Sequence, residues 1–275
     1  DGPETALEAP ATDDPIRPLV LHGTKLFSQR NHTDEASVAA NLRRLAAVLP
    51  ITRIAVDEST LERLFAGPTD DGPDPQRLAV RTFLGGGVTV ITGGPGTGKT
   101  FTIARALAAL IEASPTDRPP RIAVCAPTGK AAARMRESMS AASSGLEPGL
   151  ARRLVDIEPT TVHRLLGSRP DSRTRFRHDV HHTLGVDVVV VDECSMMSLA
   201  LLARLLESVP TGARLLLVGD PDQLESIESG SALRDIVDAD GPAPALTGRV
   251  VRLTANHRVR GNTQLGELAE AVRLG

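Results

Sequence analysis

The stretch from Val88 to Thr100 reads VTVITGGPGTGKT, and it decides the fold. Its first five residues are apolar or β-branched, as in a buried strand, and the stretch from Gly93 to Thr100 fits the pattern G-x-x-x-x-G-K-[ST]. In this pattern the backbone N–H groups of the loop and the N-terminus of the next helix surround phosphate groups. Lys99 reaches the β- and γ-phosphates, and Thr100 can ligate Mg²⁺. We therefore predict a nucleotide site here rather than an ordinary glycine-rich turn.

Other aliphatic runs repeat the strand pattern along the chain. They alternate with helical or polar segments and cover Arg121 to Ala126, Val186 to Val191, Arg214 to Val218 and Val250 to Leu253. Such alternation is typical of a parallel sheet flanked by helices, so we predict an α/β fold.

The N-terminal part follows a different pattern. Residues 1–17 are acidic and contain proline, as in a linker, and residues 18–73 predict a small helical region. There, an apolar stripe from Val38 to Leu49 indicates a helix capped by Thr33 or Asp34, and Ser59 begins a second helix.

A larger domain is predicted over residues 74–275. Asp74 and Pro75 open a helix that runs to Leu84. The polar, arginine-rich segment at about 142–183 predicts an irregular basic insertion.

Composition excludes several classes of protein. The chain has 275 residues, and its net charge of -3 argues against a polycationic DNA coat. With 5 Phe and no Trp or Tyr, a broad base-stacking platform is not available. Cys125 and Cys194 have no ligand-like spacing and are expected to be reduced core residues, without a disulfide or zinc. The sequence has no run of ~20 apolar residues and no secretion signal near its start, so we expect a cytoplasmic protein without a membrane span.

Polar residues follow the later strands where ligands of parallel sheets bind. Asp192 and Glu193 come after the Val186 to Val191 run; Asp192 would hold Mg²⁺ and Glu193 would polarise the attacking water. Gln223 could hydrogen-bond the γ-phosphate and that water, and Arg258 could offset the developing charge. Taken singly, these residues also fit solvated turns and surface charges.

The phosphate loop, Asp192-Glu193, residues 219–224 and residues 253–258, in that order, resemble motifs I to IV of superfamily 1 helicases. Within that group the chain resembles most the RecD family, the alpha subunit of exodeoxyribonuclease V. The matching segments are residues 93–100, 126–132, 161–167, 192–196, 219–224 and 253–258. The resemblance implies that residues 74–275 form a RecA-like P-loop NTPase domain, the helicase domain called 1A.

The resemblance also implies further site residues. Gln76 matches the glutamine that reads adenine; a first-turn helix residue that faces water remains the alternative. The implied nucleotide-binding set is Gln76, Gly93, Gly94, Pro95, Gly96, Thr97, Gly98, Lys99, Thr100 and Phe101. The implied contacts to single-stranded DNA are Pro127, Thr128, Gly129, Lys130, Thr161 and His163. For Lys130 a plain solvated lysine, for His163 core packing, and for the basic insertion a solvated loop remain open.

The function implied by the resemblance is 5′-to-3′ movement along single-stranded DNA driven by ATP and Mg²⁺. The setting would be a RecBCD-like helicase–nuclease for double-strand breaks, with RecB-like and RecC-like subunits. The chain stops after motif IV, so we expect a fragment without the second RecA-like domain, with weak hydrolysis and no unwinding. The alternative is a nucleotide-controlled regulatory or assembly subunit, and a phosphotransferase is disfavoured because Gln223 and Arg258 would then have no role.

Overall fold

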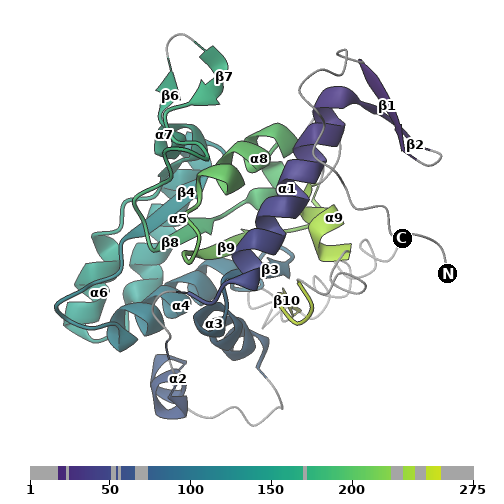
Figure 1. The fold of residues 1–275 in the computed structure, drawn as a ribbon. Coiled ribbons are helices and arrows are strands. Elements are labelled where there is room, and N and C mark those ends of the chain that lie inside the picture. The colour runs from purple at the N-terminus through teal and green to yellow at the C-terminus, as the bar shows by residue number, and fades with distance from the viewer. Residues whose placement is uncertain are drawn as a thin grey trace.

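The computed structural model describes residues 18–22, 25–50, 54, 57–65, 74–169, 172–223, 232–238 and 246–254. Figure 1 shows a central sheet with helices packed on both of its faces. The strands are β1 (Leu19–His22), β2 (Lys25–Ser28), β3 (Val88–Gly93), β4 (Ile122–Ala126), β5 (Thr160–Thr161), β6 (Ser168–Arg169), β7 (Ser172–Phe176), β8 (Val188–Val191), β9 (Arg214–Gly219) and β10 (Val250–Leu253). The helices are α1 (Gln29–Ala47), α2 (Glu58–Leu64), α3 (Pro75–Gly85), α4 (Lys99–Ala113), α5 (Gly129–Ser143), α6 (Pro148–Val155), α7 (Val162–Leu166), the 3₁₀-helix η1 (Cys194–Met196), α8 (Leu199–Ser208) and α9 (Ala232–Asp238).

The central sheet is parallel, in the order β10-β3-β9-β8-β4-β5. Successive side chains of a strand point to opposite faces, so each inner strand feeds two apolar cores. In β3, Val88 and Val90 pack in the core that contains α1, α7, α8 and α9, whereas Ile91 packs with α3, α4, α5 and α6. Both faces are therefore covered, as the aliphatic strand sequences require.

The predicted α/β class is confirmed, and the five predicted strand runs are β3, β4, β8, β9 and β10. The prediction of an irregular insertion at about 142–183 is wrong for much of that segment. The described part of that segment forms α6, β5, α7, β6 and β7, and the β6–β7 hairpin projects from the body in Figure 1. β5 has only two residues, Thr160 and Thr161, which pair with Cys125 and Ala126 of β4. A strand of two residues has no periodicity that a sequence could show, so it is recognised only from its pairing with β4.

The N-terminal caps differ from the prediction. α1 begins at Gln29 because the Ser28 hydroxyl accepts the N–H of Asn31 at 3.2 Å, so Thr33 and Asp34 lie inside the helix. α2 is capped by Asp57, whose carboxylate accepts the Ser59 N–H at 3.3 Å. The Asp74 cap with Pro75 at the first helical position is confirmed for α3.

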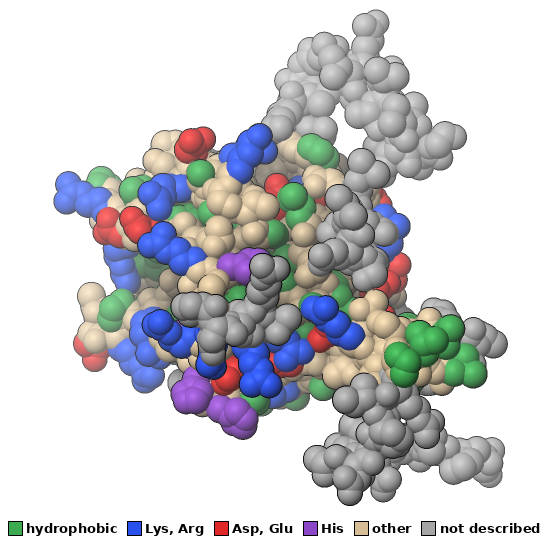
Figure 2. Space-filling view, turned by 90° about the horizontal axis from the view of Figure 1, so that it is seen from above, with side chains coloured by type: hydrophobic (Ala, Val, Ile, Leu, Met, Phe, Trp, Pro, Cys, Tyr) green, Lys and Arg blue, Asp and Glu red, His purple; other side chains and the backbone are tan. Residues whose placement is uncertain are grey.

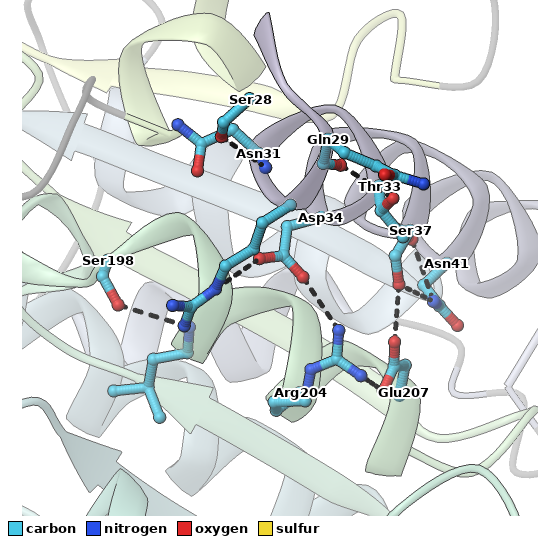
Figure 3. Close-up of polar contacts among 12 residues, drawn as sticks. Ser28, Gln29, Asn31, Thr33, Asp34, Ser37, Asn41, Ser198, Arg204 and Glu207 are labelled. Atoms are coloured by element: carbon cyan, nitrogen blue, oxygen red, sulfur yellow. Dashed lines mark hydrogen bonds and ion pairs between the residues drawn. The ribbon is translucent and has the colours of Figure 1, made fainter. Parts of the chain in front are cut away.

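α1 packs against α8, and a polar network fixes the two helices (Figure 3). Asp34 is only 5% exposed and accepts a hydrogen bond from Arg204 at 2.8 Å. Arg204 also donates to Glu207 at 2.8 Å, and the Ser37 hydroxyl donates to the same carboxylate at 2.7 Å. The contacts join positions about 170 residues apart, so α1 is a layer of the same core as the sheet. The division between residues 18–73 and 74–275 stays a prediction.

We expect Asp34→Ala to lower the free energy of unfolding by about 1–3 kcal/mol, because a buried charged hydrogen bond is lost. The cost stays in this range because Arg204 is partly exposed and keeps Glu207. Urea unfolding followed by circular dichroism measures the change. Glu35→Ala is the matched control, since Glu35 is exposed on the same helix turn and should change stability by less than about 0.5 kcal/mol. Equal losses in both variants would contradict a structural role for Asp34.

Both cysteines are free and buried, as the sequence predicts for core thiols. Burial raises the pKa of both thiols, that of Cys194 to about 12. Among the described residues, no helix has the length and apolar character needed to cross a bilayer.

Candidate nucleotide site

The phosphate loop joins β3 to α4 in the conformation that its glycines permit. Gly96 and Gly98 have φ of 82° and 83°, in the left-handed region that favours glycine. Gly93 needs its missing side chain for another reason. A Cβ there would lie 2.6 Å from the Thr97 hydroxyl and 2.7 Å from the Leu253 carbonyl oxygen. The loop therefore keeps its shape through both backbone conformation and close packing.

Lys99 points back over this loop. Its Nζ donates to the carbonyl oxygens of Gly93 at 2.6 Å and Gly94 at 3.1 Å. The Thr97 hydroxyl donates to the same Gly94 oxygen at 2.9 Å. The ammonium is thus positioned at the start of α4, where the helix dipole also favours an anion.

Gln76 reaches the loop from the first turn of α3. Its Nε2 donates to the carbonyl oxygen of Thr97 at 3.4 Å, while its own N–H is held by the Asp74 carboxylate at 2.8 Å. The structure therefore brings Gln76 to the phosphate loop across 21 residues of sequence. Its reading of adenine stays a prediction.

Asp192 and Glu193 follow β8 at the same edge of the sheet. Burial raises the pKa of Asp192 to about 6; the Glu193 N–H, donated to Asp192 at 2.9 Å, and the charge of Lys99 oppose this shift. Glu193 has φ 53°, and among the described residues it alone is a non-glycine residue with positive φ. Such strain persists only where the surroundings impose it, and it is common at functional sites.

Gln223 lies in a turn after β9. The turn is closed by the Gln223 N–H, which donates to the Asp220 carbonyl at 3.2 Å, and by the Asp222 N–H, which donates to the Asp220 carboxylate at 3.1 Å. Gly219 at the strand end packs against η1, since a Cβ there would lie 3.0 Å from the Ser195 nitrogen. The segments carrying Glu193 and Gln223 are therefore in direct contact. Arg258 lies outside the described residues.

One cavity of about 940 Å³ brings these side chains together. It is lined from four segments: the phosphate loop with α4, one face of α5 along most of its length, the turn after β8, and the turn after β9. Its lining includes Pro95, Gly96, Gly98, Lys99, Thr100, Phe101, Asp192, Glu193 and Gln223. Lys99 and the polar groups that follow β8 and β9 thus face one space large enough for a nucleotide.

The cavity offers ligands that fit Mg²⁺. Asp192 supplies a carboxylate and Thr100 a hydroxyl, and Mg²⁺ takes oxygen ligands while keeping several positions for water and substrate phosphates. The donor set is therefore suited to a metal that is held partly by a nucleotide.

The predicted DNA residues lie at the neighbouring strand ends. Thr128 caps α5 and accepts the Ala131 N–H at 3.1 Å, and Thr161 caps α7 and accepts the Arg164 N–H at 3.2 Å. Each hydroxyl still has its proton to donate to a phosphate. Pro127 and Gly129 flank the first cap, and Lys130 follows it, exposed. The upper face of the molecule carries many Lys and Arg side chains (Figure 2).

His163 has features of both alternatives that the sequence leaves open, core packing and contact with DNA. The residue is exposed, and its ring packs edge-on against Phe176 with a centroid distance of 5.7 Å. The packing partner comes from β7, in the segment predicted to be irregular. An imidazole held this way can still present a ring nitrogen outward.

Two features near the site are missed by sequence reasoning. The Phe101 ring lies 4.4 Å from the buried guanidinium of Arg105 and edge-on to Phe65 at 5.9 Å. Arg134 also lines the cavity. The four-residue spacing from Lys130 to Arg134, which places both on one helix face, is the signal that could have found it.

Comparison with known proteins identifies the family. Residues 76–229 match the AAA domain family. The RecD subunit of the RecBCD enzyme from Mycolicibacterium smegmatis is 44% identical over 94% of this chain and 44% of its own length. An ATP-dependent RecD2 DNA helicase from Deinococcus radiodurans is 35% identical over 82% of this chain and 27% of its own. Among solved structures, the Pif1 helicase from Candida albicans aligns with a TM-score of 0.43 and 18% identity, over 73% of this chain and 44% of its own.

The chain thus spans less than half the length of these curated relatives. Its phosphate loop and the segments that follow β8 and β9 all lie within residues 76–229. The chain belongs to the AAA domain family, and is a nucleotide-binding domain similar to that of RecD proteins.

Proposed function

We propose that this chain is the ATP-binding part of a DNA helicase subunit that moves 5′ to 3′ along single-stranded DNA. The observation that carries the proposal is the convergence of Lys99, Glu193 and Gln223 on one cavity. A lysine, a carboxylate and a neutral amide are the groups that hydrolysis of a γ-phosphate uses. The larger assembly would be a cytoplasmic RecBCD-like helicase–nuclease for double-strand breaks, with RecB-like and RecC-like partners; the names of the relatives support this.

The chain's own residues would divide the work. Lys99 would exchange its loop carbonyl partners for phosphate oxygens, and Glu193 would accept a proton from the attacking water. Gln223 would orient that water and contact the γ-phosphate through its amide. Thr100 and Asp192 would hold Mg²⁺, which when bound neutralises charge on the phosphate oxygens. Gln76 would read the adenine edge, and Arg258 would supply a further cation.

Single-stranded DNA would lie along Thr128, Lys130, Thr161 and His163. Thr128 follows β4 and Thr161 ends the adjacent parallel strand β5, so both residues lie at the same sheet edge as the nucleotide cavity. Phosphate contacts of this type are independent of DNA sequence.

The test is the ATPase rate of this chain with and without single-stranded DNA over a range of salt concentrations. We expect DNA to raise the rate and the stimulation to fall steeply as salt increases, because phosphate contacts release counterions. Double-stranded DNA of the same length is the control. Nucleotide binding without any response to single-stranded DNA would contradict the helicase proposal and leave only the nucleotide site.

A further inference from the structure

Arg134 faces the nucleotide cavity, and no other described residue pairs with its side chain. It lies one helical turn after Lys130 on α5, and its side chain lines the same cavity as Lys99 and Asp192. Arg134 makes no hydrogen bond or ion pair with another residue in the part of the chain that the structure describes. Glu137 lies three positions further along the same helix face, but its carboxylate forms no ion pair with the Arg134 guanidinium. The guanidinium is therefore available to a ligand.

Arg136 on the same helix has a different environment. It lies beside α6, where its guanidinium is 3.9 Å from the carboxylate of Glu158. Both arginines are exposed and only two residues apart, but only Arg134 lines the cavity. The chain thus supplies its own comparison for the effect of losing one arginine charge from α5.

The charges in the cavity explain what Arg134 could bind. Asp192 and Glu193 bring negative charge to the place where a triphosphate would lie, and the two lysines of the cavity, Lys99 and Lys130, do not offset these carboxylates together with the phosphates. A planar guanidinium can donate two parallel hydrogen bonds to phosphate oxygens, and it keeps its charge at any ordinary pH.

The sheet order indicates which phosphate is met. β4, which leads into α5, pairs with β8, which leads into Asp192. α5 therefore approaches the phosphate loop from the side of the carboxylates, where the terminal phosphate is expected, and opposite to α3, which carries Gln76 near the loop. A contact from Arg134 would distinguish a triphosphate from a diphosphate.

We propose that Arg134 binds the terminal phosphate of the nucleoside triphosphate and that α5 thereby links the nucleotide to the DNA loop. The inference rests on the proposed function and deepens it. Thr128 caps α5 through its hydroxyl, and Lys130 lies in the first turn of this helix. A shift of α5 when Arg134 binds a phosphate would therefore also move Thr128 and Lys130. Arg134 is thus a positioning residue for the DNA-binding loop.

The first experiment compares Arg134→Ala with Arg136→Ala in this chain. Binding of a fluorescent non-hydrolysable ATP analogue and of fluorescent ADP is measured with Mg²⁺ present. We expect Arg134→Ala to weaken binding of the triphosphate about 10-fold, the loss of one charged contact, and to leave ADP affinity nearly unchanged. Arg136→Ala should change neither affinity. Arg134→Lys should recover part of the loss, because it keeps the charge without the paired donors.

The second experiment measures binding of a single-stranded oligonucleotide by fluorescence anisotropy with the ATP analogue, with ADP and without nucleotide. In the unaltered chain, DNA affinity should differ between the two nucleotides, and Arg134→Ala should abolish that difference without changing affinity in the absence of nucleotide. Lys130→Ala should instead weaken DNA binding under all three conditions.

The outcomes separate the inference from the function on which it rests. If the unaltered chain binds neither nucleotide, the proposed function and this inference both fail. If it binds nucleotide and Arg134→Ala behaves as Arg136→Ala does, only the inference is overturned. Weaker DNA binding by Arg134→Ala without nucleotide, at unchanged triphosphate affinity, would also overturn it and assign the guanidinium to the DNA backbone.

Discussion

Glu193→Gln is expected to slow ATP hydrolysis by about 10²- to 10⁴-fold, the contribution of a positioned general base. The amide has nearly the shape of the carboxylate but cannot accept the proton of the attacking water. The backbone at φ 53° is unchanged by the substitution, and Asp192, Thr100 and Lys99 stay in place. Affinity for ATP and Mg²⁺ should therefore remain close to that of the unaltered chain. Phosphate release under saturating ATP, with binding measured separately, tests both parts.

The matched control for this prediction is Glu137→Gln. Glu137 lines the same cavity but comes from α5 and is given no part in hydrolysis. If Glu193→Gln and Glu137→Gln slow hydrolysis equally, the cause is the loss of negative charge from the cavity, and Glu193 is not the general base. If Glu193→Gln retains the full rate, the attacking water is activated by another group.

Lys99→Ala is expected to weaken ATP binding by roughly 10- to 100-fold, since charged hydrogen bonds to phosphate are lost in a partly buried site. The same change also removes the lysine contacts to the Gly93 and Gly94 carbonyls, at 2.6 and 3.1 Å. Because a phosphate-binding cation is lost as well, hydrolysis should remain slow at saturating ATP. Titration with a fluorescent nucleotide and steady-state rates separate the two effects.

Lys130→Ala serves as the control for Lys99→Ala, because both lysines line the cavity. It should preserve nucleotide affinity and lower affinity for single-stranded DNA. In the full-length protein, Lys99→Ala also separates the two functional readings. Loss of movement along DNA supports a motor, whereas unaltered movement with changed assembly supports a regulatory subunit.

Much of the nucleotide site could be predicted because its geometry is local. Glycines at positions 96 and 98 permit positive φ, and aliphatic runs before Lys99 and Asp192 predict buried strands whose ends face ligands. The cap at Asp74 is also local, since the carboxylate bonds an N–H two residues later. For each of these features the interacting groups are only a few residues apart in the sequence.

The errors fall where distant residues compete with local preference. Asp34 is a good capping residue, yet it serves Arg204 on α8 and leaves the cap to Ser28. The short strand β5 exists because β4 offers its free edge, and the polar segment around it folds onto that edge. A local pattern cannot show such contacts, since their stabilising energy depends on a partner far away in the chain.

The sequence by itself determined the five strands β3, β4, β8, β9 and β10, the phosphate loop, and the polar residues at the strand ends, because these follow from short-range sterics and periodicity. Only the tertiary structure decided the strand order, the burial of Asp34 under α8, and the meeting of Arg134 with the nucleotide cavity. The physical reason is that strand pairing and helix packing join surfaces that are up to 170 residues apart in the sequence, and the free energy of that joining depends on the shapes and charges of both surfaces together.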